Sequence, residues 1–251
     1  MAKTGLKDIF DKKDLGLWLK HIPRRISLRR FKKNTPLEVI SALEYKLARL
    51  RLPGVRLNIA KNDGRHDVII PIPLFPSFEN VYYYIAVIID ATMPLSSFYA
   101  GLMGEALALE ITKLGLNACW VSGNFKRSAV NTKLNEPEKI AAIIPFGLPL
   151  GNNKGKERKT LNALCRDNPS TWPLWAYNTA EAVRLAPSAL NRQPWRFDFT
   201  GNTLRITFKK INSLDAGIAM LHALCALQDV PYRLSIDINL NSCDIFVEDK
   251  A

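Results

Sequence analysis

Hydrophobic residues recur at helical spacing in several segments of this chain, and each such segment predicts a helix. From residue 96 to residue 114, apolar side chains with interspersed Gly and Ala predict a long helix that ends at Gly115 in a left-handed cap position. A second helix is expected to begin with Thr35 as its capping residue and to reach about Arg51. A further helix is expected near residues 127–134.

Strands are predicted where apolar residues form short continuous runs or alternate with polar residues. The runs at residues 82–89 and 140–149 are continuous and indicate buried strands. At residues 195–199 aromatic residues alternate with Arg196 and Asp198, which indicates a half-buried strand.

A polar loop is predicted after a helix at residues 172–185. Pro187 ends that helix because its ring clashes with the preceding turn and it has no N–H to donate. Ser188, Asn191 and Gln193 follow on non-helical backbone, and each side chain can donate and accept hydrogen bonds. Such a loop suits recognition of a flat, hydrogen-bonding ring. The alternative is an ordinary helix-to-strand turn built from Asn and Pro.

The composition bounds the class of protein. With 251 residues and 47% hydrophobic residues, the chain can form one large or two modest cores. It holds no apolar run of the roughly 18–20 residues that a membrane-spanning helix needs, and its first residues lack the apolar core of a signal peptide. The four cysteines are scattered, without a Cys-x-x-Cys motif or nearby His pairs, which argues against a metal site or a disulfide framework. We therefore expect a cytoplasmic protein.

Positive charge is concentrated in the first part of the chain. The formal net charge is +12, and residues 1–33 carry eleven Lys or Arg against three Asp or Glu. Such a segment could bind nucleic acid or an anionic membrane surface, or it could reserve a few arginines for one phosphate group. No nucleic-acid-binding signature accompanies it, so we expect neither nucleic acid nor membrane as a partner.

One part of this basic segment has the pattern of a phosphate site. If residues 24–31 are extended, Arg25, Ser27 and Arg29 lie on the side opposite Ile26 and Leu28. Guanidinium groups form short and often bidentate hydrogen bonds with phosphate. The alternative interpretation is a solvated basic patch.

Four segments together resemble the nitroreductase-like flavoproteins. Residues 186–195, Ala-Pro-Ser-Ala-Leu-Asn-Arg-Gln-Pro-Trp, resemble the Ala-Pro-Ser-x-x-Asn-x-Gln-Pro-Trp segment of that family. Residues 25–31 resemble its Arg-x-Ser-x-Arg-x-Phe/Tyr segment, with Ile26 in place of the usual second arginine. Residues 114–123 resemble Leu-Gly-Leu-x-x-Cys-Trp-x-x-Gly, and residues 156–158 match a Lys-x-Arg pair.

The resemblance implies a site for flavin mononucleotide, FMN, and assigns roles to residues by position. The arginines and the lysine of these motifs would bind the ribityl phosphate, and Ser27 and Ser188 would help to hold the cofactor. Asn191 and Gln193 would hydrogen-bond the ring edge or the ribityl chain. Backbone amides of the Cys-Trp-x-x-Gly segment would approach the flavin beside N5, where an N–H donor stabilises developing charge. The implied cofactor-binding residues are Arg25, Ser27, Arg29, Ser122, Gly123, Lys156, Arg158, Pro187, Ser188, Asn191 and Gln193.

An internal repeat indicates that the chain contains two related halves. Residues 214–224 echo residues 98–107, and both begin an apolar helix with Ala-Gly. Family members of the usual kind are homodimers with each flavin between subunits, and the motifs divide accordingly between approximate halves 1–165 and 166–251. We therefore expect one α+β domain over residues 1–251, a monomeric pseudo-dimer with antiparallel sheet flanked by helices and with one flavin site.

The function that the resemblance implies is an FMN-dependent oxidoreductase. Hydride would pass from NADH or NADPH to flavin N5 and then to a small acceptor such as a nitroaromatic compound or a quinone. The flavin carries this chemistry, so no catalytic side chain and no metal is expected. The alternatives are a flavin-binding protein without efficient turnover and a basic protein that binds nucleic acid or a membrane surface.

Overall fold

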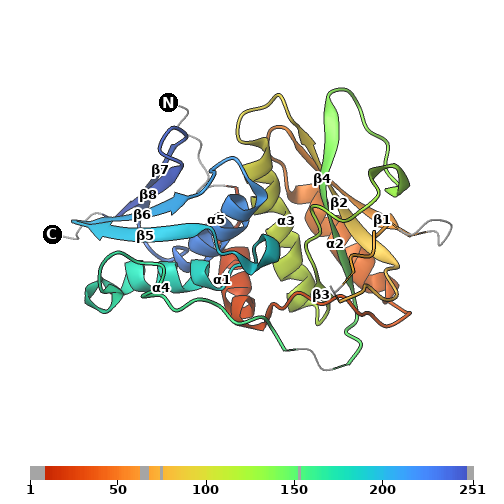
Figure 1. Ribbon diagram of the computed structural model, residues 1–251, viewed down its shortest axis with the longest axis horizontal. Coiled ribbons are helices and arrows are strands. Elements are labelled where there is room, and N and C mark those ends of the chain that lie inside the picture. The colour runs from red at the N-terminus through yellow and green to blue at the C-terminus, as the bar shows by residue number, and fades with distance from the viewer. Residues whose placement is uncertain (1–8, 63–67, 74–75, 152–153, 248–251) are drawn as a thin grey trace.

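The computed structural model describes residues 9–62, 68–73, 76–151 and 154–247 (Figure 1). The helices are α1 (Lys12–His21), α2 (Leu37–Arg49), α3 (Ser96–Lys113), α4 (Leu174–Arg184) and α5 (Leu214–Ala226). The strands are β1 (Val55–Lys61), β2 (Tyr83–Asp90), β3 (Asn117–Ala118), β4 (Glu138–Gly147), β5 (Trp195–Thr200), β6 (Thr203–Phe208), β7 (Tyr232–Asp237) and β8 (Ser242–Val247).

Two antiparallel sheets lie on opposite sides of the central helices α3 and α5 (Figure 1). The first sheet has the strand order β1-β2-β4-β3 and the second has the order β5-β6-β8-β7. This arrangement confirms the expected α+β fold with antiparallel sheets and helices. Residues 164–166 run beside β5, where Phe197 N donates to the Leu164 carbonyl at 2.9 Å. The exact boundary between the two halves stays a prediction.

Helices α3 and α5 cross at a pair of glycines. A Cβ on Gly101 would lie 2.3 Å from the Leu214 carbonyl oxygen, and one on Gly217 would lie 1.9 Å from the Phe98 carbonyl oxygen. Two helix backbones can approach so closely only where neither carries a side chain. The two Ala-Gly helices of the repeat are therefore packed against each other, and both are buried over almost their whole length.

Two local predictions were wrong, and the backbone shows why. Helix α2 begins at Leu37 with Pro36 in the cap position, extended at φ −58° and ψ 137°, so Thr35 does not cap it. At residues 127–134 only a 3-10 turn forms, Arg127–Ala129. The chain then leaves helical geometry because the Asn131 N–H donates to the Tyr84 hydroxyl at 2.8 Å rather than to a helical carbonyl.

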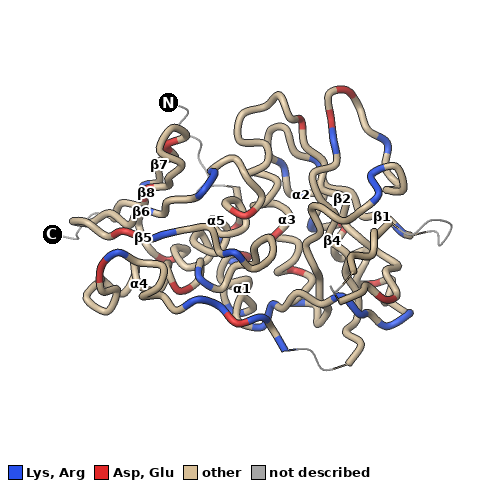
Figure 2. The backbone as a smooth tube through the Cα atoms, viewed as in Figure 1, with Lys and Arg blue, Asp and Glu red and all other residues tan. Residues whose placement is uncertain are grey.

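No helix among the described residues is long and apolar enough to cross a membrane. They contain no cluster of His, Cys, Asp or Glu suited to a metal ion, and the four cysteines are free thiols. Figure 2 shows Lys and Arg on both halves of the molecule.

Candidate functional site

A cavity of about 900 Å³ lies between the two halves, within the size range of ligand pockets. It is lined by residues from both halves, so neither half forms it alone. Gln193 is the only one of the expected cofactor-binding residues that lies outside the lining. Those that line it are Arg25, Ser27, Arg29, Ser122, Gly123, Lys156, Arg158, Pro187, Ser188 and Asn191.

The segment after α1 forms one side of the cavity. It is extended, and it pairs with β3 through the Leu28 N–H, which donates to the Ala118 carbonyl at 3.2 Å. Leu28 is buried in the core while Ser27 and Arg29 face the cavity, as the alternation predicts. Ile26 also lines the cavity, so the separation of polar and apolar faces is incomplete.

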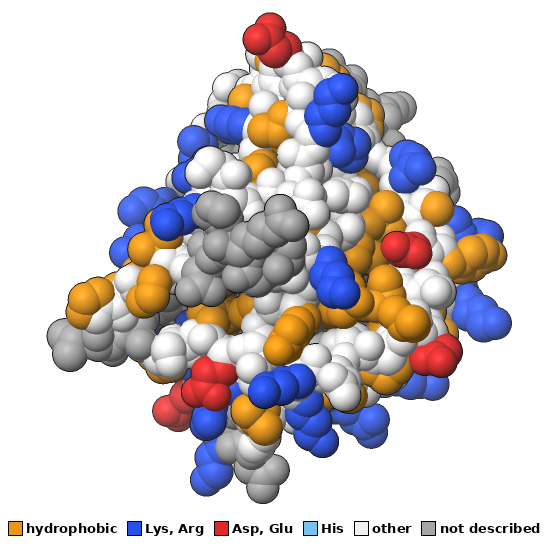
Figure 3. Space-filling view, turned by 90° about the vertical axis from the view of Figure 1, so that its right-hand side faces the viewer, with side chains coloured by type: hydrophobic (Ala, Val, Ile, Leu, Met, Phe, Trp, Pro, Cys, Tyr) orange, Lys and Arg blue, Asp and Glu red, His pale blue; other side chains and the backbone are white. Residues whose placement is uncertain are grey.

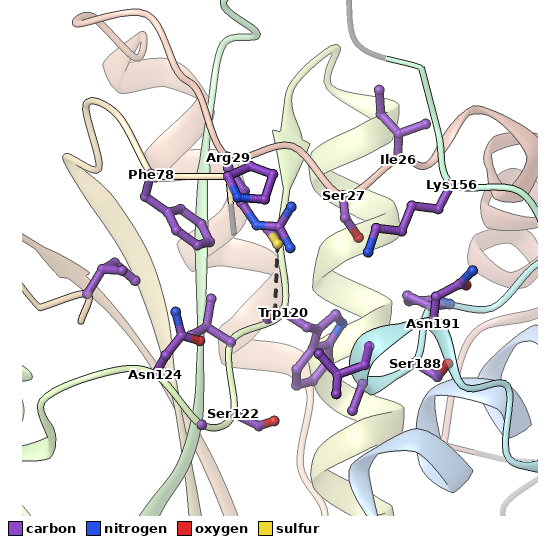
Figure 4. Close-up of a pocket in the computed structure, with 18 of the residues that line it drawn as sticks. Ile26, Ser27, Arg29, Phe78, Trp120, Ser122, Asn124, Lys156, Ser188 and Asn191 are labelled. Carbon is purple, nitrogen blue, oxygen red and sulfur yellow. Dashed lines mark hydrogen bonds between the residues drawn. The ribbon is translucent and has the colours of Figure 1, made fainter. Parts of the chain in front are cut away.

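In the view of Figure 4, Ser27, Arg29 and Lys156 lie on one side of the cavity, and Trp120, Ser122 and Asn124 lie on the other. The Arg29 guanidinium stacks on Phe78, with 5.7 Å between its central carbon and the ring centroid. Arginine is favoured in such contacts because its flat cation interacts with the ring face. Phe78 therefore orients a side chain that sequence reasoning assigned to the cofactor.

Arg25 lies deeper than the other cationic residues. Its side chain is 3% exposed, and its Nε is 3.5 Å from Oε1 of Glu105. Nε and Nη2 of Arg25 have no hydrogen-bond partner within the described structure, although both are buried. Buried guanidinium donors are costly to leave unsatisfied, so they indicate a place where an anionic or polar ligand atom fits.

Arg158 adds a second, half-buried cation to the same wall. Its guanidinium donates to the Asn191 side-chain oxygen and to the Leu185 carbonyl, the latter at 3.4 Å. Burial lowers the pKa of Arg158 to about 10, and repulsion from Arg25 and Arg184 adds to the effect against the attraction of Glu105. The wall therefore carries surplus positive charge, which a bound anion would offset.

The loop between α4 and β5 has an uncommon backbone. Leu190, Asn191 and Gln193 have φ angles of 53°, 58° and 51°, in the left-handed region that residues other than glycine seldom occupy. Two side chains hold this conformation. The Ser188 hydroxyl accepts from the Gln193 N–H at 2.8 Å, and the Asp215 carboxylate accepts from the Ala189 N–H at 3.0 Å. Strain of this kind persists only where surrounding contacts enforce it.

The side-chain amides of this loop bind the Lys-x-Arg segment. Asn191 Nδ2 donates to the Glu157 carbonyl at 2.8 Å, and Gln193 Oε1 accepts from the Lys159 N–H at 2.8 Å. Gln193 is 2% exposed and lies behind the cavity wall. The two segments therefore form one unit. Direct contact of either amide with a flavin stays a prediction.

The opposite side of the cavity is more open. Ser122 and Gly123 are exposed, and a Cβ added to Gly123 would meet nothing within 4 Å. Cys119 also lines the cavity and is buried, and burial raises the pKa of its thiol despite the opposing effect of Arg29, Arg25 and Lys156. The thiol therefore stays protonated at neutral pH and does not supply a thiolate nucleophile.

Sequence reasoning missed an apolar wall of the cavity and an acidic residue beside the loop. The wall comes from the segment between β1 and β2, and the Ile70 N–H joins it to the Asn124 carbonyl at 2.9 Å. Exposed hydrophobic side chains also appear between Lys and Arg on the face in Figure 3. Asp215 lies in the first turn of α5 and lines the cavity. The wall residues include Val68, Ile69, Ile70, Pro71, Ile72 and Phe78.

Only part of the cavity lining and its supporting contacts could have been found from the sequence. Residues 68–70 form a short apolar run, but nothing in the sequence pattern indicated what this run faces. Glu105, which touches Arg25, stands alone among apolar residues in the middle of α3, and a carboxylate in such a helix needs partners. The position of Glu105 could therefore have identified it from the sequence as a buried residue with polar partners.

A family model described as "Putative TM nitroreductase" matches residues 18–227 of the chain. These residues include every residue that lines the cavity. No match was found among curated proteins.

Solved structures with a similar fold include a "putative nitroreductase" of Thermotoga maritima, with a TM-score of 0.62 and 24% identity over 92% of this chain and 93% of that one. This likeness shows the fold. An FMN-dependent nitroreductase of Clostridium difficile has a TM-score of 0.45 and 15% identity, over 57% of this chain and 91% of that one. A nitroreductase of Bacteroides fragilis with bound FMN has a TM-score of 0.44 and 13% identity, over 57% and 94%.

Proposed function

The chain belongs to the nitroreductase family whose model it matches, and from this premise we propose that it is an FMN-dependent oxidoreductase. When bound, FMN would supply the redox chemistry by accepting hydride from NADH or NADPH and passing it to a small acceptor such as a nitroaromatic compound or a quinone. The residues of the chain would bind, orient and shield the reactants. The proposal names no catalytic side chain.

The observation that carries the proposal is the surplus positive charge of Arg25 and Arg158, because the single carboxylate of Glu105, 3.5 Å from Arg25, offsets only one of the two charges. Two buried nitrogen atoms of Arg25 make no hydrogen bond within the described structure, and the pKa of Arg158 is lowered to about 10. A phosphate group would accept hydrogen bonds from Arg25 and offset the repulsion between the two arginines. Arg29 and Lys156 line the same cavity and would extend this site to the rest of the phosphate.

The remaining lining suits the uncharged parts of FMN. The Ser188 oxygen already accepts from the Gln193 N–H, so its own O–H is available to donate to a ribityl or ring oxygen. The open surroundings of Gly123 permit close approach of a ring to the backbone. The apolar wall opposite would shield a flat acceptor from water.

We also propose that the protein acts as a monomer with one such site. Both sides of the cavity come from a single chain, so a partner subunit is not needed to complete it.

The proposed function is tested by the absorbance spectrum of the purified protein, with added FMN and then with NADH or NADPH in the absence of oxygen. We expect a bound yellow flavin that bleaches on reduction and recovers when a quinone is added. If flavin binds but neither nucleotide reduces it, only the flavin-binding part of the proposal stands. If the protein does not bind FMN, the proposal is overturned.

A further inference from the structure

Glu105 is the centre of a buried polar cluster behind the cavity wall. Its side chain is fully buried in α3 and does not line the cavity. Its Oε2 accepts from Trp120 Nε1 at 2.8 Å. Its Oε1 lies 3.0 Å from His222 Nε2 and 3.5 Å from Arg25 Nε. Trp120 and Arg25 both line the cavity, so one carboxylate contacts two residues of the site.

The packing of the helices explains why these groups meet. Glu105 lies one turn after the crossing glycine of α3, and His222 lies just over one turn after the crossing glycine of α5. Gly104 leaves room for the indole, since a Cβ there would lie 2.3 Å from Cη2 of Trp120. The cluster is therefore built into the contact between the two halves.

The hydrogen bonds of His222 fix the number of protons in the cluster. Its Nδ1 lies 2.9 Å from the Ala182 carbonyl oxygen, and its Nε2 faces the Glu105 carboxylate, so both ring nitrogens face acceptors. A neutral imidazole has only one N–H to donate. The two oxygens of Glu105 face nitrogen atoms of Trp120, Arg25 and His222, so the second proton lies between Glu105 Oε1 and His222 Nε2. Arg158 and Cys225 also interact with Glu105.

We propose that Glu105 is a positioning residue of the FMN site: it aligns the guanidinium of Arg25 and the indole of Trp120, and a doubly protonated His222 from the other half holds it in place. The role of Arg25 toward FMN rests on the proposed function. The existence of the cluster does not rest on the proposed function, because its contacts are made in the protein without a ligand.

The substitution Glu105→Gln separates positioning from charge. The amide of Gln can donate to His222 Nε2, which then needs no second proton. The cluster loses one negative and one positive charge, and its net charge is unchanged. A change in affinity for FMN would therefore report the alignment of Arg25 and not the electrostatic attraction of the site.

Helix α3 offers a matched control in Glu110. This carboxylate is also buried, and its Oε2 accepts from Trp18 Nε1 at 2.9 Å while Oε1 accepts from Lys113. None of these three residues lines the cavity. Glu110→Gln therefore removes an equivalent buried carboxylate from the same helix without touching the site.

The first experiment uses proton–nitrogen NMR correlation spectra of the ligand-free protein. In the wild type we expect both ring N–H signals of His222, and in Glu105→Gln we expect one. The indole signal of Trp120, identified by Trp120→Phe, should shift in Glu105→Gln and stay in place in Glu110→Gln. A single ring N–H on His222 in the wild type would overturn the proposal, and that measurement needs no variant to fold.

The second experiment measures FMN affinity by fluorescence titration. We expect Glu105→Gln to weaken FMN binding by about 10- to 100-fold, the effect of losing one charge-assisted hydrogen bond. Glu110→Gln should weaken it by no more than about 2-fold, even if both variants lose similar thermal stability. Equal affinities in the two variants would overturn the positioning role. If the wild type does not bind FMN, the proposed function fails, while the NMR experiment still tests the cluster.

Discussion

Gly101 and Gly217 face each other across the centre of the molecule, so close that a Cβ added to Gly101 would lie 2.9 Å from the α-carbon of Gly217. The contact joins two helices that the sequence repeat had identified as copies of one another. These two helices come from the two halves whose residues together line the cavity.

The substitution Gly217→Ala should destabilise the protein. Its Cβ would lie 1.9 Å from the Phe98 carbonyl oxygen, and a helix backbone cannot shift without moving its whole half. We expect a loss of at least about 1–3 kcal/mol in the free energy of unfolding, the usual cost of overpacking. Urea denaturation would measure it. Gly123→Ala, where a Cβ meets nothing within 4 Å, serves as the control and should stay close to wild type.

The substitution Arg158→Gln should weaken FMN binding by about 1.5–3 kcal/mol, the range for hydrogen bonds to charged groups. Burial and repulsion from Arg25 and Arg184 lower the pKa of Arg158, so its charge is costly to the folded protein without a bound anion and the loss should fall on binding more than on folding. Isothermal titration and thermal unfolding would compare the two effects. Arg166→Gln is the control, because that side chain is 80% exposed and outside the cavity. Equal affinity in both variants would contradict the phosphate assignment.

Asp215 should make stability depend on pH. Burial raises the pKa of this carboxyl, against the hydrogen bond from the Ala189 N–H and the attraction of Arg192. The folded protein thus holds this proton more tightly than the unfolded chain, so stability contributed by Asp215 falls as pH rises from the ordinary carboxyl range through the raised pKa.

In Asp215→Asn that fall should disappear, because the amide oxygen still accepts from Ala189 and carries no charge. Relative to wild type, the variant should gain stability between about pH 4 and about pH 7. Denaturant unfolding at the two pH values would measure it. If the difference in the free energy of unfolding between wild type and Asp215→Asn is the same at both pH values, burial of the carboxylate costs nothing. Asp215→Ala, which also removes the acceptor, should lose the loop contact at both pH values.

The oligomeric state has a direct test. Because one chain supplies both sides of the cavity, light scattering during gel filtration should give the mass of a single chain, 28.3 kDa, with and without FMN. FMN binding that appears only in a dimeric fraction would contradict the single-chain site.

Prediction from sequence succeeded where one pattern dominates a segment. The apolar run of α3 and its end at Gly115, with φ +79°, follow from local rules for helices and their caps. The polar loop before β5 was placed correctly. Its left-handed residues were not foreseen, since they depend on contacts with Asp215, which lies far along the chain.

The rest of the site depends on contacts between distant segments. The apolar wall at residues 68–72 faces the cavity because it joins residues 124–126, and no periodicity in either segment encodes that pairing. Thr35 illustrates the opposite failure. A local capping motif was present, but Pro36 next to it holds the cap position in extended geometry.

The presence of both central helices in one chain has a consequence for how the protein can change. In a symmetric dimer every substitution appears twice, once on each side of the axis. Here the repeat aligns Gly101 with Gly217, so Glu105 corresponds to Leu221 and Ala106 corresponds to His222. An acid on one helix and a base on the other can therefore be acquired by independent mutations. Because the two helices are encoded at separate positions of one gene, a mutation can change one helix and leave the other unchanged. Selection can therefore act on such an asymmetric pair.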